Sequence, residues 1–304
     1  MIAMKPTGYI DGFIGPIDQI RIPVLDRGFL YGDSVYEVFR TYQGIPFLFD
    51  EHYQRLLNSA RLCGMHITQT PQQLVEAIKQ TIEASENSEA EDVYVRYQIT
   101  RGEGAVDLYP EPGLVSRLII IVKPVPSWKR EFYDVGMTMS IPHQRRNAIT
   151  SLDPNIKGGN YLNNILALAE SRDQGKDECL MLDAKGLVTE CSNSNAWFVM
   201  GDKYVTPQAG NLVGLTRTTL MQLFSDAGLE AVERSIYSEE LIEASECFIT
   251  SATREVMPVK SLTLESGREL EFAKGGGPKT RKAMALYTAM IERFVDDNRD
   301  KAWF

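Results

Sequence analysis

Residues 151–164 read Ser-Leu-Asp-Pro-Asn-Ile-Lys-Gly-Gly-Asn-Tyr-Leu-Asn-Asn, with a single lysine, Lys157, between a polar turn and an apolar periodic run. The two glycines after Lys157 leave the backbone open at this point. Asn160 is the predicted N-cap of a helix over about 160–173. Lys157 is therefore expected at the mouth of a helix, where a desolvated amine can form a Schiff base. On this stretch alone, an exposed loop lysine is the more common outcome.

The composition is typical of a globular protein, with 43% hydrophobic and 24% charged residues. A length of 304 residues accommodates two domains. The net charge of −9 does not favour a nucleic-acid partner. No stretch approaches the roughly 20 apolar residues of a membrane helix, and the N-terminus has no signal-peptide hydrophobic segment, so we expect no membrane partner and a cytoplasmic location. The four cysteines and three histidines are scattered, which predicts reduced thiols and no metal site.

Two later stretches share a pattern with the lysine segment. Residues 188–195 read Val-Thr-Glu-Cys-Ser-Asn-Ser-Asn, and residues 214–217 read Gly-Leu-Thr-Arg. Together with Ile156–Asn164 they resemble the class IV (fold type IV) pyridoxal-phosphate aminotransferases, a family that includes branched-chain and D-amino acid aminotransferases and aminodeoxychorismate lyase. Matches to this family occur in order from about residue 21 to residue 283, which is nearly the whole chain.

The resemblance implies an α/β (α+β) fold with two domains and pyridoxal 5'-phosphate bound at the domain interface. It also implies a homodimer whose active site lies near the subunit interface. The two prolines in residues 123–127 favour a linker there. We therefore predict a smaller α/β domain over 1–122, an interdomain linker over 123–133, and a larger cofactor-binding domain over 134–304.

Hydrophobic periodicity predicts several elements of the first domain. Residues 93–100 alternate as a strand, which places Tyr94 and Arg96 on one face. The further predictions are a strand over 35–42, a second strand over 45–49, a helix over 51–60 capped by Asp50, an amphipathic helix over 71–85, and an acidic loop over 87–92.

The resemblance assigns the lysine and the cofactor contacts. Lys157 matches the catalytic lysine that forms the Schiff base, and Glu190 matches the carboxylate beside the pyridine nitrogen. Arg55 matches an arginine that binds the cofactor phosphate, through donors arranged in a fixed fork. Without the resemblance, Glu190 would be interpreted as a turn carboxylate and Arg55 as an exposed helix residue.

Further cofactor contacts follow from the same resemblance. Leu215 and Thr216 open a helix, whose free backbone N–H groups suit a phosphate, although a lone Gly-x-Thr is more often a capping motif. Ser251, Ala252 and Thr253 match a second phosphate and carboxylate loop. Ala252 stands where a threonine is usual, so one hydroxyl donor is missing. Tyr161 matches the residue that bonds the phenolic oxygen of the cofactor.

The predicted substrate-binding residues are Tyr31, Tyr36, Val38, Tyr94 and Arg96. Their motifs are mixed. Tyr94-Val95-Arg96 resembles the branched-chain enzymes, whereas Tyr36-Glu37-Val38 resembles D-amino acid aminotransferases. A Pro-Arg-x-His carboxylate trap is absent after Arg101.

These matches favour a transaminase that moves an amino group between an amino acid and a 2-keto acid. A branched-chain-like L-amino acid donor is preferred, with (R)-amines as a further class. D-amino acid transamination is the alternative, and aminodeoxychorismate lyase is an alternative of a different reaction class. A binding protein without catalysis also stays open, although it would not need both Lys157 and Glu190.

Overall fold

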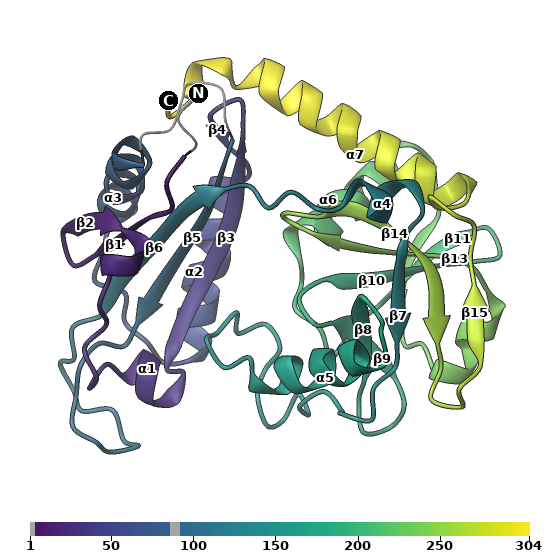
Figure 1. Cartoon of the computed structure of the whole chain (residues 1–304), viewed down its shortest axis with the longest axis horizontal. Helices are drawn as coiled ribbons and strands as arrows, with labels where there is room; N and C mark the ends of the chain where they lie inside the picture. The colour runs from purple at the N-terminus through teal and green to yellow at the C-terminus, as the bar shows by residue number, and fades with distance from the viewer. Residues whose placement is uncertain (1–3, 86–91) are drawn as a thin grey trace. The chain divides into compact units, whose positions relative to one another are not determined.

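Two β-sheets organise the chain in the computed structural model, which describes residues 4–85 and 92–304. They belong to two compact units (Figure 1). Unit 1 contains the residues up to Pro126 together with Ile156–Asn160 and Arg293–Phe304, and unit 2 contains Ser127–Asn155 and Tyr161–Glu292. The short segment that carries Lys157 is thus part of unit 1, although its flanking residues belong to unit 2. The role predicted for the larger domain in cofactor binding stays a prediction.

The sheet of unit 1 has six strands in the order β2-β1-β6-β5-β3-β4, and every neighbouring pair is antiparallel. The strands are β1 (Thr7–Ile10), β2 (Phe13–Pro16), β3 (Ser34–Tyr42), β4 (Ile45–Pro46), β5 (Val93–Thr100) and β6 (Arg117–Pro124). The predicted strand over 93–100 is confirmed, and its alternating burial leaves Tyr94 and Arg96 half-buried on one face.

One face of this sheet is covered by two helices, α2 (Phe49–Leu62) and α3 (Pro71–Ala84) (Figure 1). Leu56 from α2 and Ile78 from α3 pack with Phe39 and Tyr97 of the strands in one buried cluster. The predicted helix over 71–85 is confirmed, and it begins with a capping box between Thr70 and Gln73.

The prediction that Asp50 caps the first of these helices is wrong. Helix α2 begins at Phe49, and its N-cap is Leu48 in a left-handed conformation with φ 52°. Phe49 is packed against Trp303 and Phe39 as part of the helix, so the strand before it ends early, at Pro46. Of the predicted acidic loop over 87–92, only Asp92 lies within the described residues.

The end of the chain returns to unit 1. Helix α7 (Pro278–Asp297) begins in unit 2, and its last residues, from Arg293, belong to unit 1. A short 3-10 turn, η3 (Arg299–Lys301), follows. The Trp303 backbone N–H donates to the Gly44 carbonyl at 2.9 Å, and its ring meets the rings of Phe39 and Phe49 edge-on. The tail therefore completes the aromatic core of unit 1. Unit 1 also contains α1 (Arg27–Tyr31) and η1 (Ile17–Gln19).

Unit 2 is built on a nine-stranded sheet with the order β12-β11-β10-β13-β14-β7-β8-β9, and β15 pairs with β14. The pairs β11–β12, β14–β7 and β7–β8 are parallel, and β9 also contacts β10 and β11, so the sheet curls. The strands are β7 (Met137–Ser140), β8 (Glu178–Leu182), β9 (Val188–Cys191), β10 (Asn195–Met200), β11 (Lys203–Pro207), β12 (Ala231–Arg234), β13 (Ala244–Ser251), β14 (Glu255–Thr263) and β15 (Glu269–Glu271).

Both faces of the β10 strand are buried. Ala196 and Phe198 point into the main apolar cluster of unit 2, whereas Trp197 meets Phe224 of helix α6 edge-on. The helices of this unit are α4 (Arg130–Asp134), α5 (Leu162–Asp173) and α6 (Leu215–Asp226), with the 3-10 helix η2 (Ser238–Glu243). Helix α5 packs through Ala167 on β8. Helix α5 is thereby held against β8, and helix α6 against β10.

Candidate active site

The backbone of the Lys157–Gly159 segment is held in unit 1 by three hydrogen bonds. The Tyr36 N–H donates to the Lys157 carbonyl at 2.9 Å, and the Gly159 N–H donates to the Ser34 carbonyl at 2.9 Å. The Lys157 N–H donates to Ser59 Oγ on α2 at 3.1 Å. The segment therefore extends the edge of β3, and a β-bridge joins Val35 to Gly158.

This arrangement corrects the expected position of the helix. Helix α5 begins at Leu162, and its N-cap position is Tyr161, which makes no side-chain cap. Asn160 instead lies beside Gly32 in unit 1, where a Cβ on Gly32 would meet the Asn160 backbone at 3.5 Å. The prediction that Asn160 caps the helix is therefore wrong. Because residues 156–160 follow β3, the helix starts only after the chain has left that strand.

The amine of Lys157 lies against the ring of Tyr36. Lys157 Nζ is 3.5 Å from Tyr36 Oη and 4.6 Å from the ring centroid. Arg96 contacts the same ring, with Cζ 3.6 Å from the centroid. Two cations on one aromatic ring are each stabilised by its quadrupole. The structure thus brings together three of the predicted residues, Lys157, Tyr36 and Arg96.

Arg96 is connected to the lysine segment by residues that the sequence analysis did not select. Arg96 Nη2 donates to Gln98 Oε1 at 2.8 Å, and Gln98 Nε2 donates to Ser34 Oγ at 2.7 Å. A Cβ on Gly159 would lie 2.3 Å from Ser34 Oγ, so only glycine fits there without a shift. The position of Arg96 is therefore linked through two side chains to the loop of Lys157.

Arg55 is held by a buried carboxylate. Its Nε donates to Glu37 Oε1 and its Nη2 to Glu37 Oε2, both at 2.7 Å. His52 Nδ1 lies 2.7 Å from the same Oε2. Burial alone raises the pKa of Glu37, but the charge and hydrogen bonds of Arg55, with the contact to His52, outweigh burial and lower this pKa to about 2. Burial lowers the pKa of His52.

Glu37 therefore fixes one edge of the Arg55 guanidinium in a defined plane. Arg55 lies one helical turn before Ser59, the residue that binds the Lys157 backbone. The sequence analysis missed Glu37 because alternation along a strand does not reveal a partner 18 residues later.

The remaining predicted residues of unit 1 lie around this group. Val38 is paired across the sheet with Arg96. Lys123 Nζ lies 4.8 Å from the centroid of the Tyr94 ring. Burial raises the pKa of Tyr94. Tyr31 ends helix α1, and Arg27 Cζ lies 5.0 Å from its ring centroid.

In unit 2, Glu190 is buried and hydrogen-bonded through both oxygens. Arg146 Nη2 donates to Glu190 Oε1 at 2.7 Å, and the Leu212 N–H donates to Oε2 at 3.1 Å. Arg146 Nη1 donates to Asn164 Oδ1 at 3.2 Å, and Asn164 belongs to the first turn of α5, just after Tyr161. Arg146 and the Leu212 backbone therefore hold the Glu190 carboxylate in a defined orientation.

A second feature of unit 2 is the N-terminus of α6. The helix begins at Leu215 and Thr216, and Gly214 is the N-cap. A Cβ on Gly214 would lie 2.0 Å from Asn195 Oδ1, so glycine is required for this close approach. The first N–H groups of a helix have no partner within it, and they point outward with the positive end of the helix dipole. This end can accept an anion.

A turn at the end of β13 lies next to the same region. Asn195 pairs with Thr250 across β10 and β13, and its Nδ2 donates to the Leu212 carbonyl at 2.8 Å. The turn contains Ser251, Ala252 and Thr253, all half-buried. Unit 2 therefore brings together Glu190, the start of α6 and the 251–253 turn through Asn195.

Comparison with known proteins identifies the family. The model for amino-transferase class IV matches residues 34–262. The chain belongs to the class IV aminotransferase family.

A putative branched-chain-amino-acid aminotransferase of Methanocaldococcus jannaschii is 32% identical over 253 residues, covering 83% of this chain and 86% of the relative. A D-alanine aminotransferase of Bacillus licheniformis is 30% identical over 254 residues, which cover 82% of this chain and 87% of the relative. The crystal structure of an aminotransferase from Brucella abortus, bound to the cofactor PLP, has a TM-score of 0.80 and 25% identity, covering 94% of this chain and 98% of that one.

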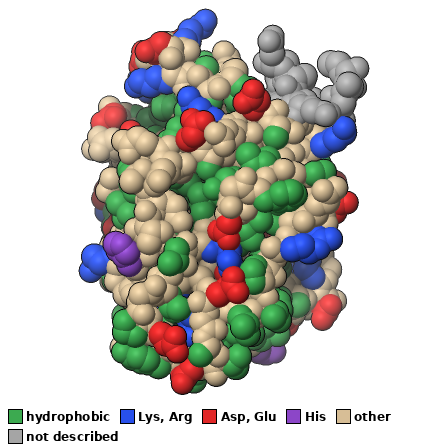
Figure 2. Space-filling view, turned by 90° about the vertical axis from the view of Figure 1, so that its left-hand side faces the viewer, with side chains coloured by type: hydrophobic (Ala, Val, Ile, Leu, Met, Phe, Trp, Pro, Cys, Tyr) green, Lys and Arg blue, Asp and Glu red, His purple; other side chains and the backbone are tan. Residues whose placement is uncertain are grey.

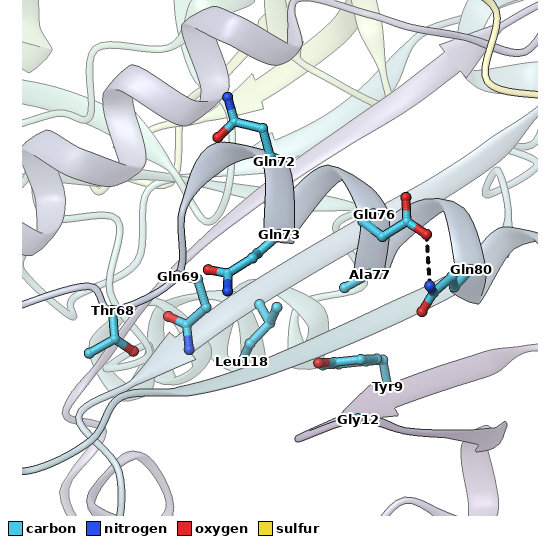
Figure 3. Close-up of a pocket in the computed structure, with 10 residues that line it drawn as sticks. All are labelled: Tyr9, Gly12, Thr68, Gln69, Gln72, Gln73, Glu76, Ala77, Gln80 and Leu118. Atoms are coloured by element: carbon cyan, nitrogen blue, oxygen red, sulfur yellow. Dashed lines mark hydrogen bonds between the residues drawn. The ribbon is translucent and has the colours of Figure 1, made fainter.

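This class IV aminotransferase has a separate groove of about 650 Å³ in unit 1 (Figure 3). It lies along α3, and Tyr9 and Leu118 lie on its other side. None of the predicted site residues lines it. Several of its polar side chains already have hydrogen-bond partners: Gln80 Nε2 donates to Glu76 Oε1 at 2.7 Å, and Gln69 Nε2 donates to the Ser116 carbonyl at 3.1 Å. The groove therefore adds nothing to the site around Lys157.

Neither a metal cluster nor a membrane span occurs in the part of the chain that the structure describes. Within 4–85 and 92–304, no group of three or more His, Cys, Asp or Glu side chains is arranged to hold a metal ion. Over the same residues, no helix is long and apolar enough to span a membrane.

Proposed function

We propose that this class IV aminotransferase uses pyridoxal 5'-phosphate to move an amino group from an amino acid to a 2-keto acid. The single observation that carries the proposal is Lys157, whose backbone is fixed on β3 while its amine lies beside Tyr36. A lysine whose backbone is fixed and whose side chain is half-buried suits a group that must reach one reacting carbon.

The donor set fits pyridoxal phosphate. Unit 1 supplies an amine, Lys157, and an oriented guanidinium, Arg55. Unit 2 supplies the buried carboxylate Glu190, paired with Arg146, and the N-terminus of α6. An amine, a carboxylate for a pyridinium and several phosphate donors are what this cofactor requires. The PLP bound in the Brucella abortus structure supports the same cofactor.

We assign the roles as follows. Lys157 holds the cofactor and then moves a proton at the substrate Cα, and Glu190 keeps the pyridine nitrogen protonated. The phosphate and the phenolic oxygen of the cofactor are bound by residues from several elements: Arg55, Tyr161, Leu215, Thr216, Ser251, Ala252 and Thr253. When bound, the cofactor supplies an electron-withdrawing ring that stabilises negative charge at the substrate Cα.

For the substrate, Arg96 with Tyr94 receives a carboxylate, and Tyr36, Val38 and Tyr31 shape the pocket. We favour branched-chain-like L-amino acids as donors for two reasons. The Tyr94-Val95-Arg96 motif is intact, and the Arg96 guanidinium lies over the ring of Tyr36. D-amino acid transamination is the second candidate. It is supported by the Tyr36-Glu37-Val38 motif and by the Bacillus licheniformis relative named D-alanine aminotransferase.

We infer a homodimer from the loop before β6. Arg27 is buried, and it donates to the carbonyls of Asp107 at 2.7 Å and Leu108 at 2.9 Å, so the backbone of the loop is anchored at these two residues. The side chains of Leu108 and Tyr109 are nevertheless 79% and 71% exposed. Grouped exposed apolar side chains mark interaction surfaces. Light scattering should give twice the chain mass, and a monomer would contradict the inference.

The other partners are small molecules. On the face in Figure 2, basic side chains are scattered among acidic and apolar ones, which does not favour nucleic acid. Four free cysteines support a reducing, cytoplasmic location. Cell fractionation tests the location, and recovery in a secreted fraction would contradict it.

The decisive experiment is an absorbance titration of the protein with pyridoxal phosphate, followed by amino donors. We expect a visible absorption band in the wild type and none in Lys157→Ala, while the exposed-lysine control Lys185→Ala keeps it. L-leucine should then convert the band to that of pyridoxamine phosphate. A protein that binds no cofactor would refute the function, and conversion by D-alanine but not by L-leucine would support the second candidate.

A further inference from the structure

Behind the 251–253 turn of unit 2 lies a buried ion pair that the proposed chemistry does not use. Arg254 follows the turn directly, and its side chain is 7% exposed. Arg254 Nη2 lies 3.4 Å from Oε2 of Glu178, the first residue of β8, which is 1% exposed. The Arg254 guanidinium also lies over the ring of Trp128, with Cζ 4.4 Å from the centroid.

This pair connects the 251–253 turn, which carries predicted cofactor contacts, with the bend that follows Glu190. Arg254 Nη1 donates to Ser194 Oγ at 2.8 Å and also to Asn193 Oδ1, both in the bend that follows Glu190. On the other side, Glu178 Oε1 accepts from the Ser192 N–H at 3.2 Å. The bend is therefore held from its backbone by Glu178 and from its side chains by Arg254.

The turn itself is held in an unusual conformation. The Arg254 N–H donates to Ser251 Oγ at 3.2 Å, and Trp128 Nε1 donates to the Thr253 carbonyl at 2.9 Å. Tyr133 Oη donates to the Arg254 carbonyl at 3.2 Å. The next residue, Glu255, has φ 56°, which is costly for a residue with a side chain. Backbone strain of this kind persists only where surrounding contacts hold it, and it is concentrated at functional sites.

The geometry of the Arg254–Glu178 ion pair is not the one that would best stabilise the fold. Arg254 Nε and Glu178 Oε2 are buried and make no hydrogen bond among the described residues. A buried ion pair repays its desolvation only when its geometry and its remaining hydrogen bonds are good. The cost is explained if the pair fixes the geometry of the two loops.

We propose that Arg254, through Glu178, is a positioning residue that sets the 251–253 turn to receive an oxyanion. The anion is either the cofactor phosphate or the substrate carboxylate. This inference rests on the proposed function, which places that anion at the turn. Ala252 removes one hydroxyl from the turn, so binding there depends on backbone N–H groups and on Ser251 and Thr253. The Arg254 backbone N–H donates to Ser251 Oγ, and the Arg254 side chain fixes this residue against the bend at Asn193 and Ser194.

The test compares single and double variants of the pair. Arg254→Met alone leaves Glu178 buried without its partner and should unfold at a lower temperature. The double variant Arg254→Met/Glu178→Gln removes both charges and should unfold close to the wild-type temperature. If Arg254 positions the turn, the double variant still binds pyridoxal phosphate or amino donor about 10–100-fold more weakly, since small misplacements are costly in a binding site.

Two measurements distinguish the source of the anion. A weaker dissociation constant for pyridoxal phosphate indicates the cofactor phosphate. A higher KM for the amino donor at saturating cofactor, with kcat less affected, indicates the substrate carboxylate. The matched control is Arg234→Met/Glu240→Gln, a half-exposed pair at 2.8 Å in the same unit, which should leave both values unchanged.

A stable double variant with wild-type values in both measurements would overturn the inference. If the double variant does not fold, Arg254→Lys is tested instead, because it keeps the positive charge but loses the forked donors of the guanidinium. A wild-type dissociation constant and a wild-type KM in that variant would also overturn the inference. A wild type that binds no pyridoxal phosphate would refute the proposed function itself, and the inference with it.

Discussion

Glu37 accepts two parallel hydrogen bonds of 2.7 Å from Arg55, one from Nε to Oε1 and one from Nη2 to Oε2. The carboxylate comes from β3 and the guanidinium from α2, so the pair fixes the helix against the strand that also binds the Lys157 segment. Both oxygens of Glu37 are used, because His52 Nδ1 shares Oε2. The orientation of Arg55 is thus set by a residue that is itself completely buried.

Glu37→Gln tests this arrangement through acid unfolding. Because the pKa of Glu37 is lowered to about 2 in the folded protein from 4.5 ordinarily, its ionised form stabilises the fold above pH 4.5. That contribution is lost as the pH falls from 4.5 towards 2. Glu37→Gln should be less stable at neutral pH, and its free energy of unfolding should fall less steeply in this window. Denaturant unfolding at a series of pH values measures both, and equal slopes for the two proteins would contradict the prediction.

Tyr36→Phe and Tyr36→Leu separate two contributions of the same side chain. Phenylalanine keeps the ring under Arg96 and Lys157 but removes the hydroxyl 3.5 Å from Lys157 Nζ. Leucine removes the ring as well, and each cation–π contact amounts to about 0.5–2 kcal/mol. We expect a small fall in kcat/KM for Tyr36→Phe and a larger one for Tyr36→Leu. Equal losses in steady-state assays would show that the ring itself has no role.

Arg146→Met should impair activity through Glu190. Without Arg146, the buried Glu190 loses its cationic partner and keeps the Leu212 N–H. We expect kcat to fall about 10–100-fold, because the carboxylate that we propose for the pyridine nitrogen is then poorly fixed. The control is its neighbour, Arg145→Met, whose partner Glu265 is partly exposed. Steady-state kinetics on both variants provide the test, and equal effects would contradict the prediction.

Leu56 and Leu57 are a matched pair for stability. Leu56 is 0% exposed in the core of unit 1, whereas Leu57, the next residue of α2, is 36% exposed. Leu56→Ala should cost about 2–5 kcal/mol in the free energy of unfolding through the cavity it leaves. Leu57→Ala should cost less than about 1 kcal/mol, because surface changes usually have small effects. Denaturant unfolding of both variants measures the difference, and similar losses would argue against this packing.

Local patterns were enough to predict some elements of unit 1. The strand over 93–100 and the helix over 71–85 follow from alternation and from a 3.6-residue period, because each has one face in the core and one outside. Phe39, an apolar residue of the predicted strand over 35–42, is also buried.

Other features depend on contacts between distant parts of the chain, which local patterns do not contain. Asn160 has the right residue type for a cap, but the chain still follows β3 at that point. Glu37 looked like an ordinary strand residue, because its partners Arg55 and His52 come from a later helix. Strand β14 was not predicted at all, and its first residue has a positive φ that no simple strand pattern anticipates. The roles of the predicted cofactor and substrate residues stay predictions.

The division of the chain has a consequence for protein engineering. The chain passes between the units after Pro126, Asn155, Asn160 and Glu292, and the lysine travels with the short piece 156–160. A truncated gene product ending near Pro126 would therefore lack both the lysine and the tail that carries Trp303. A chimaera that exchanges unit 1 between two relatives must transplant three separate segments, and a single crossover near Pro126 would leave the Lys157 segment of one parent on strand β3 of the other.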